Sequence, residues 1–387
     1  MRILFYSQSS TVYGSPASLV NLVTGLMEVD PKLNMLVIIP DRGQLAEKLE
    51  EEKIAYKVLP HAKWVFNNNI YQRKLRQNKI LAHLWLQKNK LQRHFHNLRH
   101  KSKHQRFVAE FKPDVIYVNS SIAPMGCYMA TENKLPFIWH HRETVNDPVT
   151  GFYLDNTRAY RKYSSKAALH LHPSKFLKEK YLQFPGVNHK VIYNGVPDAP
   201  VRIRNKQAEA PVRFGMVGRI NSQKGQREVL RVFKELPQTP DTYEVHVFGS
   251  GPTQLVDRLK KEYEDISVFF RGFQEKAVIY NELDYLIVSG RHESFGRVVA
   301  EANARGIPVI AIRSGALEET VKDGENGFLY DSQYDLKQIL QRLLTGVSED
   351  FYWILSKKAR QYYLDHFSIE RCARAVYKEI MHLRPRT

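Results

Sequence analysis

The chain has 387 residues, of which 43% are hydrophobic and 11% aromatic, and its formal net charge is +18 at pH 7. This length predicts two domains, each large enough to bury its own core. No apolar run reaches about 18 residues, so no membrane-spanning helix is expected, and Met1–Tyr6 is too short and too soon polar for a signal peptide. Cys127 and Cys372 form neither a disulfide framework nor a metal spacing, which favours a reducing cytoplasm.

The first half of the chain alternates strands and helices. Arg2–Tyr6 predicts a buried strand, and Asn34–Ile39 predicts a second one. Between them, Gly14 precedes Ser15 and Pro16, an expected N-cap followed by proline at the first helical position, and a helix is expected to run to about Val29. This strand–loop–helix–strand order predicts a parallel sheet. Further strands are expected at 115–119, 137–141 and 168–172.

A strongly basic window runs from Lys53 to Ala109. It holds fourteen lysines and arginines, six histidines and no acidic residue. Apolar residues within it recur near one helical face and predict a basic amphipathic helix or helix pair. One interpretation is a surface helix whose apolar side packs on the sheet; the other is contact with an anionic lipid or glycan. The apolar residues of this face are Ile80, Leu84, Leu91, Phe95 and Leu98.

Prolines bracket a polar stretch at about 197–211, which predicts a linker between the two domains. A second strand–helix series follows it, with strands expected at 213–217, 245–248, 267–270, 285–288 and 309–312. The tail, 351 to about 383, predicts two helices with a break near 366–368. No internal repeat is visible.

The segment Arg291–Glu301 contains the sharpest functional pattern. Its two glutamates, Glu293 and Glu301, stand eight positions apart around a Ser-Phe-Gly turn that opens an apolar helix. Ser294 is an expected N-cap, so free backbone N–H groups and a partly positive helix end would point out of the turn. Such a turn holds phosphate well, and Glu301 can accept hydrogen bonds from a diol. The pattern indicates a site for a sugar, a diphosphate and a ribose.

A second signal is a pair of cations on one loop. Arg219 and Lys224 follow an expected strand, with glycines directly before and after them. Cations aimed at diphosphate oxygens stabilise the negative charge that grows when a nucleotide sugar loses its sugar. Taken alone, the pair also fits a solvated basic loop. Gly249-Ser250-Gly251 is half of a dinucleotide fingerprint and weak alone.

Together these motifs resemble the retaining glycosyltransferases of family 4 (glycosyl transferases group 1), most densely from about Tyr193 to Asp331. The resemblance implies the GT-B fold, an α/β architecture of two Rossmann-like domains with parallel sheets facing across a cleft. It places acceptor binding in residues 1–197, donor binding in 198–367, and a final helix, 368–387, back on the first domain. It implies a hexosyltransferase that uses a nucleotide diphosphate sugar, of UDP or GDP type.

The same resemblance assigns roles to residues. Glu293 contacts the donor sugar, Glu301 the ribose, and Arg219 and Lys224 the diphosphate. Arg271-Gly272-Phe273 holds the base, and the turn from Ser294 to Val298 caps the phosphates through its amides. Arg297 departs from the aliphatic residue frequent at this position. The donor-binding residues implied are Gly14, Gly218, Arg219, Lys224, Gly272, Phe273, Glu293, Ser294, Phe295, Gly296, Arg297, Val298 and Glu301.

In the first half, Gly14 resembles one glycine of a two-glycine loop, with Ser15 in place of the second. The segment His140–Glu143 resembles the one that carries the family's active-site histidine. We assign that role to His141, although the register also allows His140 or Arg142. The expected catalytic set is therefore Glu293, His141, Arg219 and Lys224. No resident cofactor or metal site is expected, because the cations supply the charge.

The concentration of charge in residues 53–109 favours a lipid-linked or anionic glycan acceptor and peripheral association with the inner face of the cell membrane. The expected process is bacterial cell-surface polysaccharide or glycolipid synthesis. Two alternatives stay open: a nucleotide-sugar epimerase of similar fold, and a non-catalytic polyanion-binding protein. No recognised nucleic-acid motif occurs, so nucleic acid is not an expected partner. The base, sugar, acceptor, linkage and oligomeric state are not specified by the sequence.

Overall fold

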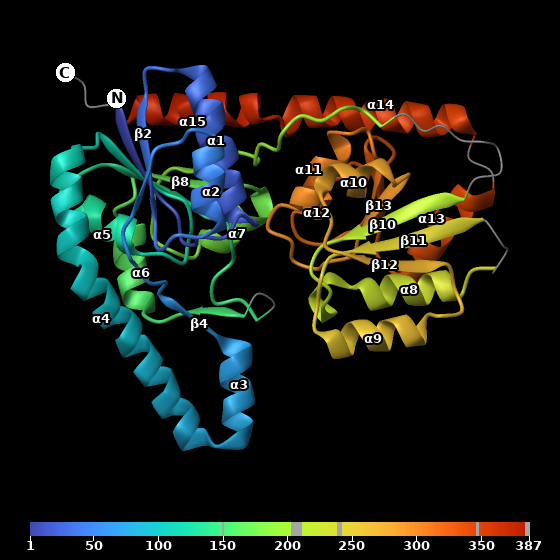
Figure 1. The fold of residues 1–387 in the computed structure, drawn as a ribbon, viewed down its shortest axis with the longest axis horizontal. Helices are drawn as coiled ribbons and strands as arrows, with labels where there is room; N and C mark the ends of the chain where they lie inside the picture. The colour runs from blue at the N-terminus through green and yellow to red at the C-terminus, as the bar shows by residue number, and fades with distance from the viewer. Residues whose placement is uncertain (149–150, 203–210, 238–241, 346–347, 384–387) are drawn as a thin grey trace. The chain divides into compact units, whose positions relative to one another are not determined.

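The computed structural model describes residues 1–387 except 149–150, 203–210, 238–241, 346–347 and 384–387 (Figure 1). The chain divides into two compact units. Unit 1 comprises Met1–Gly195 and Ile369–Thr387, and unit 2 comprises Val196–Ser368. These divisions lie within two residues of the expected ones at 197/198 and 367/368. Most of the expected linker falls on 203–210, outside the described residues.

Unit 1 is built on a seven-stranded sheet in the order β3-β2-β1-β5-β6-β8-β9, and every neighbouring pair is parallel. The central strands are short apolar runs buried on both faces, as parallel sheets require. The expected strands of this half are confirmed to within a residue or two. The strand bounds are β1 Arg2–Tyr6, β2 Asn34–Ile39, β3 Tyr56–Val58, β5 Val115–Val118, β6 Phe137–His140, β8 Leu169–His172 and β9 His189–Val191.

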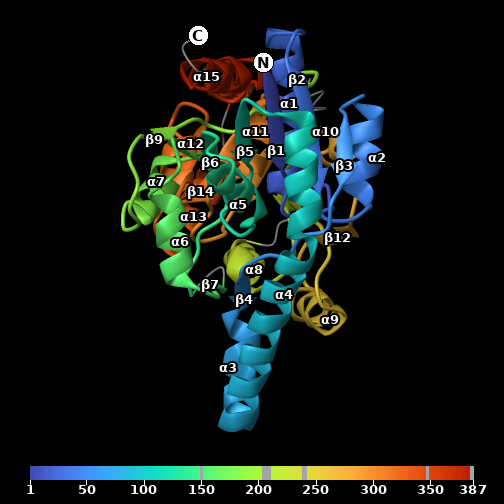
Figure 2. The same cartoon turned by 90° about the vertical axis from the view of Figure 1, so that its left-hand side faces the viewer.

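Helices cover both faces of this sheet (Figures 1 and 2). One face packs against α1 (Ser15–Val29), α2 (Gln44–Glu51) and α15 (Ile369–His382). The other packs against the end of α4 (Lys79–Phe111) and against α5 (Met125–Glu132), α6 (Thr157–Ser164) and α7 (Lys175–Tyr181). A small antiparallel pair, β4 (Val65–Asn67) with β7 (Phe152–Leu154), was not foreseen from the sequence.

The first and last helices of unit 1 pack closely because α1 carries a glycine at their contact. A Cβ placed on Gly25 would lie 2.6 Å from Ile369 Cγ2 and 2.8 Å from Ala373 Cβ. Residues from opposite ends of the chain therefore share one core. The break between α14 (Glu349–His366) and α15 falls at 367–368, where two helices were expected to separate.

Unit 2 contains a six-stranded parallel sheet in the order β12-β11-β10-β13-β14-β15. Its strands and helices share one continuous apolar core. The strands are β10 Val212–Val217, β11 Tyr243–Phe248, β12 Val268–Gly272, β13 Tyr285–Val288, β14 Val309–Ile312 and β15 Gly327–Tyr330, and the helices are α8 Gln226–Lys234, α9 Thr253–Glu262, α10 Lys276–Asn281, α11 Arg297–Asn303, α12 Leu317–Thr320, α13 Gln333–Thr345 and α14.

The strand order reverses at one point in each sheet. In unit 1, β1 pairs with β2 on one side and β5 on the other. In unit 2, β10 pairs with β11 on one side and β13 on the other. Open α/β sheets bind ligands outside the carboxyl ends of the strands at such reversals, because the two following loops diverge there. A ligand-binding site is therefore expected at the loops after β1 and β5 in unit 1 and after β10 and β13 in unit 2.

The basic window forms α3 (Asn68–Gln77) and α4, a helical hairpin that extends away from the sheet of unit 1 (Figures 1 and 2). The interpretation that its apolar stripe packs on the sheet is wrong. Leu84, Leu91 and Phe95 are 61%, 54% and 61% exposed. The opposite side of α4 faces inward instead, and it carries Asn97 and His104 among its buried residues.

The inward side of α4 is held by specific polar contacts. The Asn97 amide bonds the backbone N–H and C=O of Ala62, at 2.7 and 3.1 Å. The Arg93 guanidinium forms a bidentate pair with Asp155. The spacing of apolar residues in α4 identified one face of the helix, but it did not show whether that face packs inward or faces solvent. The reason is that the partners which hold the other face, Ala62 and Asp155, lie far from it in sequence. Among the described residues, no helix is long and apolar enough to cross a bilayer.

Candidate active site

In unit 2 the loops after β10 and β13 meet at the strand reversal. Lys224 Nζ forms an ion pair with Glu293 Oε1. Beneath this pair, the Ser289 hydroxyl donates to the backbone C=O of Lys224 at 2.7 Å. The structure thus brings together two of the residues assigned to the catalytic set. Both stay partly exposed, with 38% and 19% of their side-chain surface accessible.

Glycines make this close approach possible. Gly225 has φ +68°, and a Cβ there would lie 2.7 Å from the backbone oxygen of Ser289. A Cβ on Gly290 would lie 2.7 Å from Glu293 Oε1. Larger residues at either position would push the two loops apart or displace the carboxylate. The loop pair is therefore built to bring Lys224 and Glu293 into contact.

The remaining diphosphate-binding candidate, Arg219, lies on the same loop as Lys224 and is exposed. Within the described part of the chain, its guanidinium has no hydrogen-bond partner. Its backbone C=O accepts from the Gln226 side chain at 3.0 Å, which fixes the loop. Gly218, just before it, has φ +140° and open space on its Cβ side. Arg219 therefore lies exposed at the carboxyl end of β10, and among the described residues its guanidinium forms no ion pair.

The turn after Glu293 differs from the expectation in one respect. Ser294 is not the N-cap of α11; Gly296, with φ +75°, occupies that position and the helix begins at Arg297. A left-handed conformation favours glycine there, and a Cβ would also lie 2.8 Å from a methyl of Leu317. Phe295 is buried against Phe367, the C-cap residue of α14, with ring centroids 5.5 Å apart, and this contact holds the turn in place.

Glu301 lies on the buried side of α11, where three donors surround its carboxylate. Lys276 Nζ lies 2.5 Å and Arg297 Nε 2.9 Å from Oε1, and the Tyr280 hydroxyl donates to Oε2 at 3.1 Å. Burial alone would raise the pKa of Glu301, but the charges of Arg297 and Lys276 outweigh it and hold this pKa below its usual value. Glu301 is therefore ionised at neutral pH.

Lys276 and Tyr280 were missed by the sequence analysis. They lie on α10, more than twenty residues before Glu301, and no local spacing connects them to it. The Arg297–Glu301 pair, in contrast, has the i,i+4 spacing of a helical ion pair and could have been predicted. Arg297, the departure from the family pattern, therefore contacts the ribose-binding candidate directly.

The base-binding candidates Gly272 and Phe273 lie at the carboxyl end of β12. Gly272 has φ +67° with open space on its Cβ side, and its C=O accepts from Gly249 N at 2.7 Å. Phe273 is 69% exposed. Val298 packs partly buried against the core. All donor-site candidates except Gly14 thus belong to unit 2 and follow the carboxyl ends of its strands.

Gly14 and the histidine candidates belong to unit 1. Gly14 has φ +65° and is the N-cap of α1, so Ser15 begins the helix instead of capping it. His140 and His141 are both fully buried and Arg142 is nearly so. The Arg142 guanidinium donates to the side chains of Asn119 and Asn194.

The fully buried ring of His141 has both nitrogens engaged. Nδ1 lies 2.9 Å from the Ser121 hydroxyl and Nε2 lies 2.9 Å from Nδ1 of His170. His170 Nε2 in turn donates to the backbone C=O of Ser164 at 3.0 Å. Since a carbonyl only accepts, His170 carries its proton on Nε2, and His141 must donate from its own Nε2. The structure thus gives His141 a place in a buried histidine chain.

Within the described residues, no group of three or more His, Cys, Asp or Glu side chains could hold a metal ion. Cys127 and Cys372 are both buried and unpaired with each other. Burial raises the pKa of each thiol, which disfavours reactive thiolates.

Comparison with known proteins shows which family and fold this chain resembles. Residues 201–362 match the family model described as glycosyl transferases group 1. These residues form a glycosyl transferases group 1 domain. The protein is a glycosyltransferase. Alpha-monoglucosyldiacylglycerol synthase of Streptococcus pneumoniae is 25% identical over 308 residues, 68% of this chain and 69% of that protein. An uncharacterized glycosyltransferase of Methanocaldococcus jannaschii is 30% identical over 209 residues, 51% of this chain and 53% of that protein.

The fold of this glycosyltransferase is GT-B. The structure of Anabaena HepE in complex with UDP and glucose has a TM-score of 0.75 to it and 20% sequence identity, covering 99% of this chain and 100% of that one. At this identity the likeness shows the fold. It matches the two parallel-sheet units described above, and it confirms the fold class expected from the motifs.

The histidine chain predicts acid sensitivity of this glycosyltransferase. Burial lowers the pKa of His170 from 6.5 to about 4, while the unfolded chain protonates near 6.5. The unfolded state therefore binds more protons between these values, and the free energy of unfolding falls as the pH is lowered from 6.5 to 4. The expected loss is about 1.4 kcal/mol per pH unit for each histidine kept neutral.

Urea unfolding followed by tryptophan fluorescence at pH 7, 6, 5 and 4.5 tests this. His170→Gln should show a smaller pH slope than the wild type, whereas His94→Gln, at an exposed position on α4, should match it. Equal slopes for the wild type and His170→Gln would show that His170 is not held neutral.

Proposed function

We propose that this glycosyltransferase moves a sugar from a nucleotide diphosphate sugar, of UDP type, to an acceptor hydroxyl with retention at the anomeric carbon. The observation that carries the proposal is the Lys224–Glu293 pair at the strand reversal of unit 2, inside the glycosyl transferases group 1 domain. The complexes of HepE with UDP and glucose and with UDP-glucose support a UDP donor.

The roles follow from charge. During transfer the bond between the anomeric carbon and the diphosphate oxygen breaks, and the diphosphate keeps the electron pair. The acceptor oxygen bonds to the same carbon, and its proton passes to the departing diphosphate. Arg219 and Lys224 lower the barrier by opposing the charge that grows on the diphosphate. Glu293, held in place by Lys224, is positioned to accept hydrogen bonds from the sugar hydroxyls.

Glu301 is assigned to the ribose. An ionised carboxylate offers about four lone-pair positions, and three donors already contact Glu301. A ribose hydroxyl would take the remaining position or displace Lys276, whose side chain is 53% exposed. Arg297, only 17% exposed, would stay in place and keep Glu301 ionised.

The donor assignment predicts a nucleotide-dependent rise in thermal stability. UDP or a UDP-sugar at 100 times its Kd should stabilise the folded state by about 2.7 kcal/mol. Lys224→Ala removes a cation from the diphosphate and should reduce or abolish the rise in the unfolding midpoint. Glu301→Gln keeps the shape of the buried side chain but removes its charge, and should weaken binding by about tenfold or more.

Differential scanning fluorimetry with UDP, GDP, ADP and their common sugar conjugates measures this. Lys234→Ala is the matched control, because Lys234 is an exposed lysine of unit 2 that pairs with Asp265 away from the strand reversal. If none of these nucleotides gives a shift in a folded protein, the donor proposal is wrong. If Lys224→Ala shifts as much as the wild type, the donor does not bind at Lys224.

We also propose that the acceptor is lipid-linked and that unit 1 binds an anionic membrane surface through the α3–α4 hairpin, at the inner face of the cell membrane. The exposed apolar stripe of α4 supports this, since such a large outward stripe on a projecting helix marks an interaction site. A shallow hollow runs along the same helix from Leu84 to His100.

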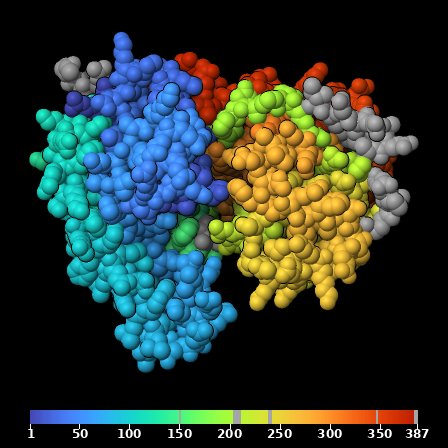
Figure 3. Space-filling view, viewed as in Figure 1, coloured from blue at the N-terminus to red at the C-terminus, as the bar shows by residue number. Residues whose placement is uncertain are grey.

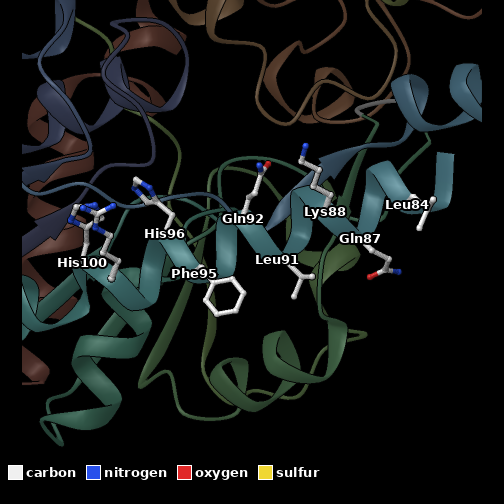
Figure 4. A pocket seen from close by; sticks show the side chains of 9 residues that line it. Leu84, Gln87, Lys88, Leu91, Gln92, Phe95, His96 and His100 are labelled. Carbon is white, nitrogen blue, oxygen red and sulfur yellow. The ribbon is translucent and has the colours of Figure 1, made fainter. Parts of the chain in front are cut away.

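The arrangement of this surface suits a bilayer interface. Leu91 and Phe95 point to one side of α4, while Lys88, Gln92 and His96 point to the other (Figure 4). In the space-filling view the hairpin forms a projecting part of unit 1 (Figure 3). Apolar side chains can enter the headgroup region while lysines and arginines meet phosphate groups. The alpha-monoglucosyldiacylglycerol synthase of S. pneumoniae, to which this chain is 25% identical, supports a lipid acceptor.

Cosedimentation with phosphatidylglycerol vesicles tests membrane binding. Leu84→Ser, Leu91→Ser and Phe95→Ser combined should reduce partitioning at least tenfold, since each buried apolar side chain contributes about 1.5 to 3 kcal/mol. Replacing Lys88 and Lys90 by Gln should weaken binding at low salt by about 1 kcal/mol per charge. Leu182→Ser, at an equally exposed position of unit 1, is the control.

No binding at low salt, or binding unchanged in both sets of variants, would contradict the membrane proposal. Salt-sensitive binding to a soluble polyanion that ignores the apolar substitutions would favour the polyanion-binding alternative instead.

A further inference from the structure

The strand reversal of unit 1 holds a carboxylate to which the sequence analysis gave no role. Glu143 follows β6, and its side chain reaches the loops after β1 and β5. The Ser120 hydroxyl lies 2.9 and 3.0 Å from its two oxygens, and the backbone N–H of Ser121 donates to Oε2 at 3.1 Å. The Ser15 hydroxyl, at the start of α1, lies 3.5 Å from Oε1. The segments after β5 and β6 and the start of α1 thus converge on one carboxylate.

The charge of Glu143 is not balanced by a contact ion pair. Among the ion pairs of the described residues, none includes Glu143, whereas Glu301 in unit 2 has two cations within 3 Å. A partly buried carboxylate without a cation partner is unfavourable for folding. Its four hydrogen-bond contacts come from hydroxyls and one amide. Such an arrangement is typical of a functional site more than of a structural one.

The surroundings of Glu143 determine its protonation. Burial raises its pKa above the usual value, and the bonds from Ser120 and Ser121 and the charges of Lys63 and Arg142 oppose this only in part. Tyr181 also faces this segment, with its hydroxyl donating to the backbone C=O of Glu143 at 2.6 Å. The raised pKa makes the carboxylate a stronger hydrogen-bond acceptor than an exposed glutamate.

From this convergence we infer that Glu143, with Ser15 and Ser120, forms a subsite in unit 1 that binds an uncharged hydroxyl group, that of a sugar ring or of a glycerol unit. A carboxylate flanked by hydroxyls accepts from an alcohol and repels a phosphate or carboxylate, so the subsite selects a neutral polyol. The inference rests on the proposed function, since it assigns this polyol to the acceptor and makes Glu143 the residue that orients its hydroxyl.

The structure offers a shape-conserving variant. Glu143→Gln retains an oxygen that can accept from Ser121 N, and its amide can donate to the Ser120 hydroxyl, so the loops should stay in place. What it removes is the negative charge and one acceptor. Glu132→Gln is the matched control, because Glu132 is a carboxylate of unit 1 that pairs with Lys101 on the surface.

Isothermal titration with glycerol, glucose and octyl β-D-glucopyranoside below its micelle concentration tests the subsite directly. The wild type and Glu132→Gln should bind one or more of these probes, and Glu143→Gln should bind it at least tenfold more weakly. Preference for octyl glucoside and glucose would identify a sugar hydroxyl, and preference for glycerol a glycerol hydroxyl. Wild-type affinity should fall as the pH is lowered through the pKa of Glu143, while Glu143→Gln should show no such dependence.

Binding of none of the probes by the wild type, or equal binding by Glu143→Gln, would overturn the inference. The UDP-induced thermal shift, measured on the same samples, separates this from the donor proposal. That shift should be the same in Glu143→Gln and in the wild type. If neither protein shows the shift, the donor proposal is wrong, and the titrations with glycerol, glucose and octyl glucoside still test the subsite by themselves. A lower unfolding midpoint of Glu143→Gln without weaker probe binding would show a structural role and also overturn the inference.

Discussion

The reversal of strand order in each parallel sheet is the constraint on which the rest of this structure depends. β1 is the first strand of unit 1 and lies between β2 and β5. β10 is the first strand of unit 2 and lies between β11 and β13. The connections that follow the two strands at a reversal lead to opposite sides of the sheet, which leaves room for polar side chains at the carboxyl ends of these strands. Lys224 and Glu293 follow β10 and β13, the two strands at the reversal of unit 2, and they are 69 positions apart in sequence. In unit 1, Ser120 and Glu143 follow the neighbouring strands β5 and β6, next to the reversal, and are 23 positions apart.

The carboxylates at the two strand reversals have different electrostatic surroundings. In unit 2, cations accompany both carboxylates, so the site is suited to a diphosphate that brings its own negative charge. In unit 1, hydroxyls and a backbone amide surround a lone carboxylate, so the site is suited to a neutral hydroxyl compound. This division of charge matches a reaction in which an anionic donor meets a neutral nucleophile, and it gives each unit a chemical role that can be tested separately.

The sequence predicted the elements of both sheets well, because buried parallel strands are short apolar runs that glycine loops and helices separate. It also singled out Arg219 with Lys224, and Glu293 with Glu301, because the spacing within each of these two pairs is local. It could not predict that Lys276 and Tyr280 contact Glu301, because tertiary folding alone brings α10 to α11. The N-cap at Gly296 was missed because Ser294 has the better capping side chain, while the chain needed a left-handed residue two positions later. The apolar stripe of α4 was recognised, but Asn97 and His104 turned the other side inward.

In the reaction of this glycosyltransferase, a sugar leaves a nucleotide diphosphate and reaches an acceptor hydroxyl. The most direct measurement is to incubate the protein with radiolabelled UDP-glucose, phosphatidylglycerol vesicles and dioleoylglycerol, and to follow both the label and the free nucleotide. We expect label in the lipid fraction, UDP released in equal amount, and an anomeric proton signal with the configuration of the donor. Label that stays on the nucleotide in an altered sugar would indicate an epimerase. If neither UDP-glucose nor any other nucleotide sugar is consumed, the protein is not a sugar transferase.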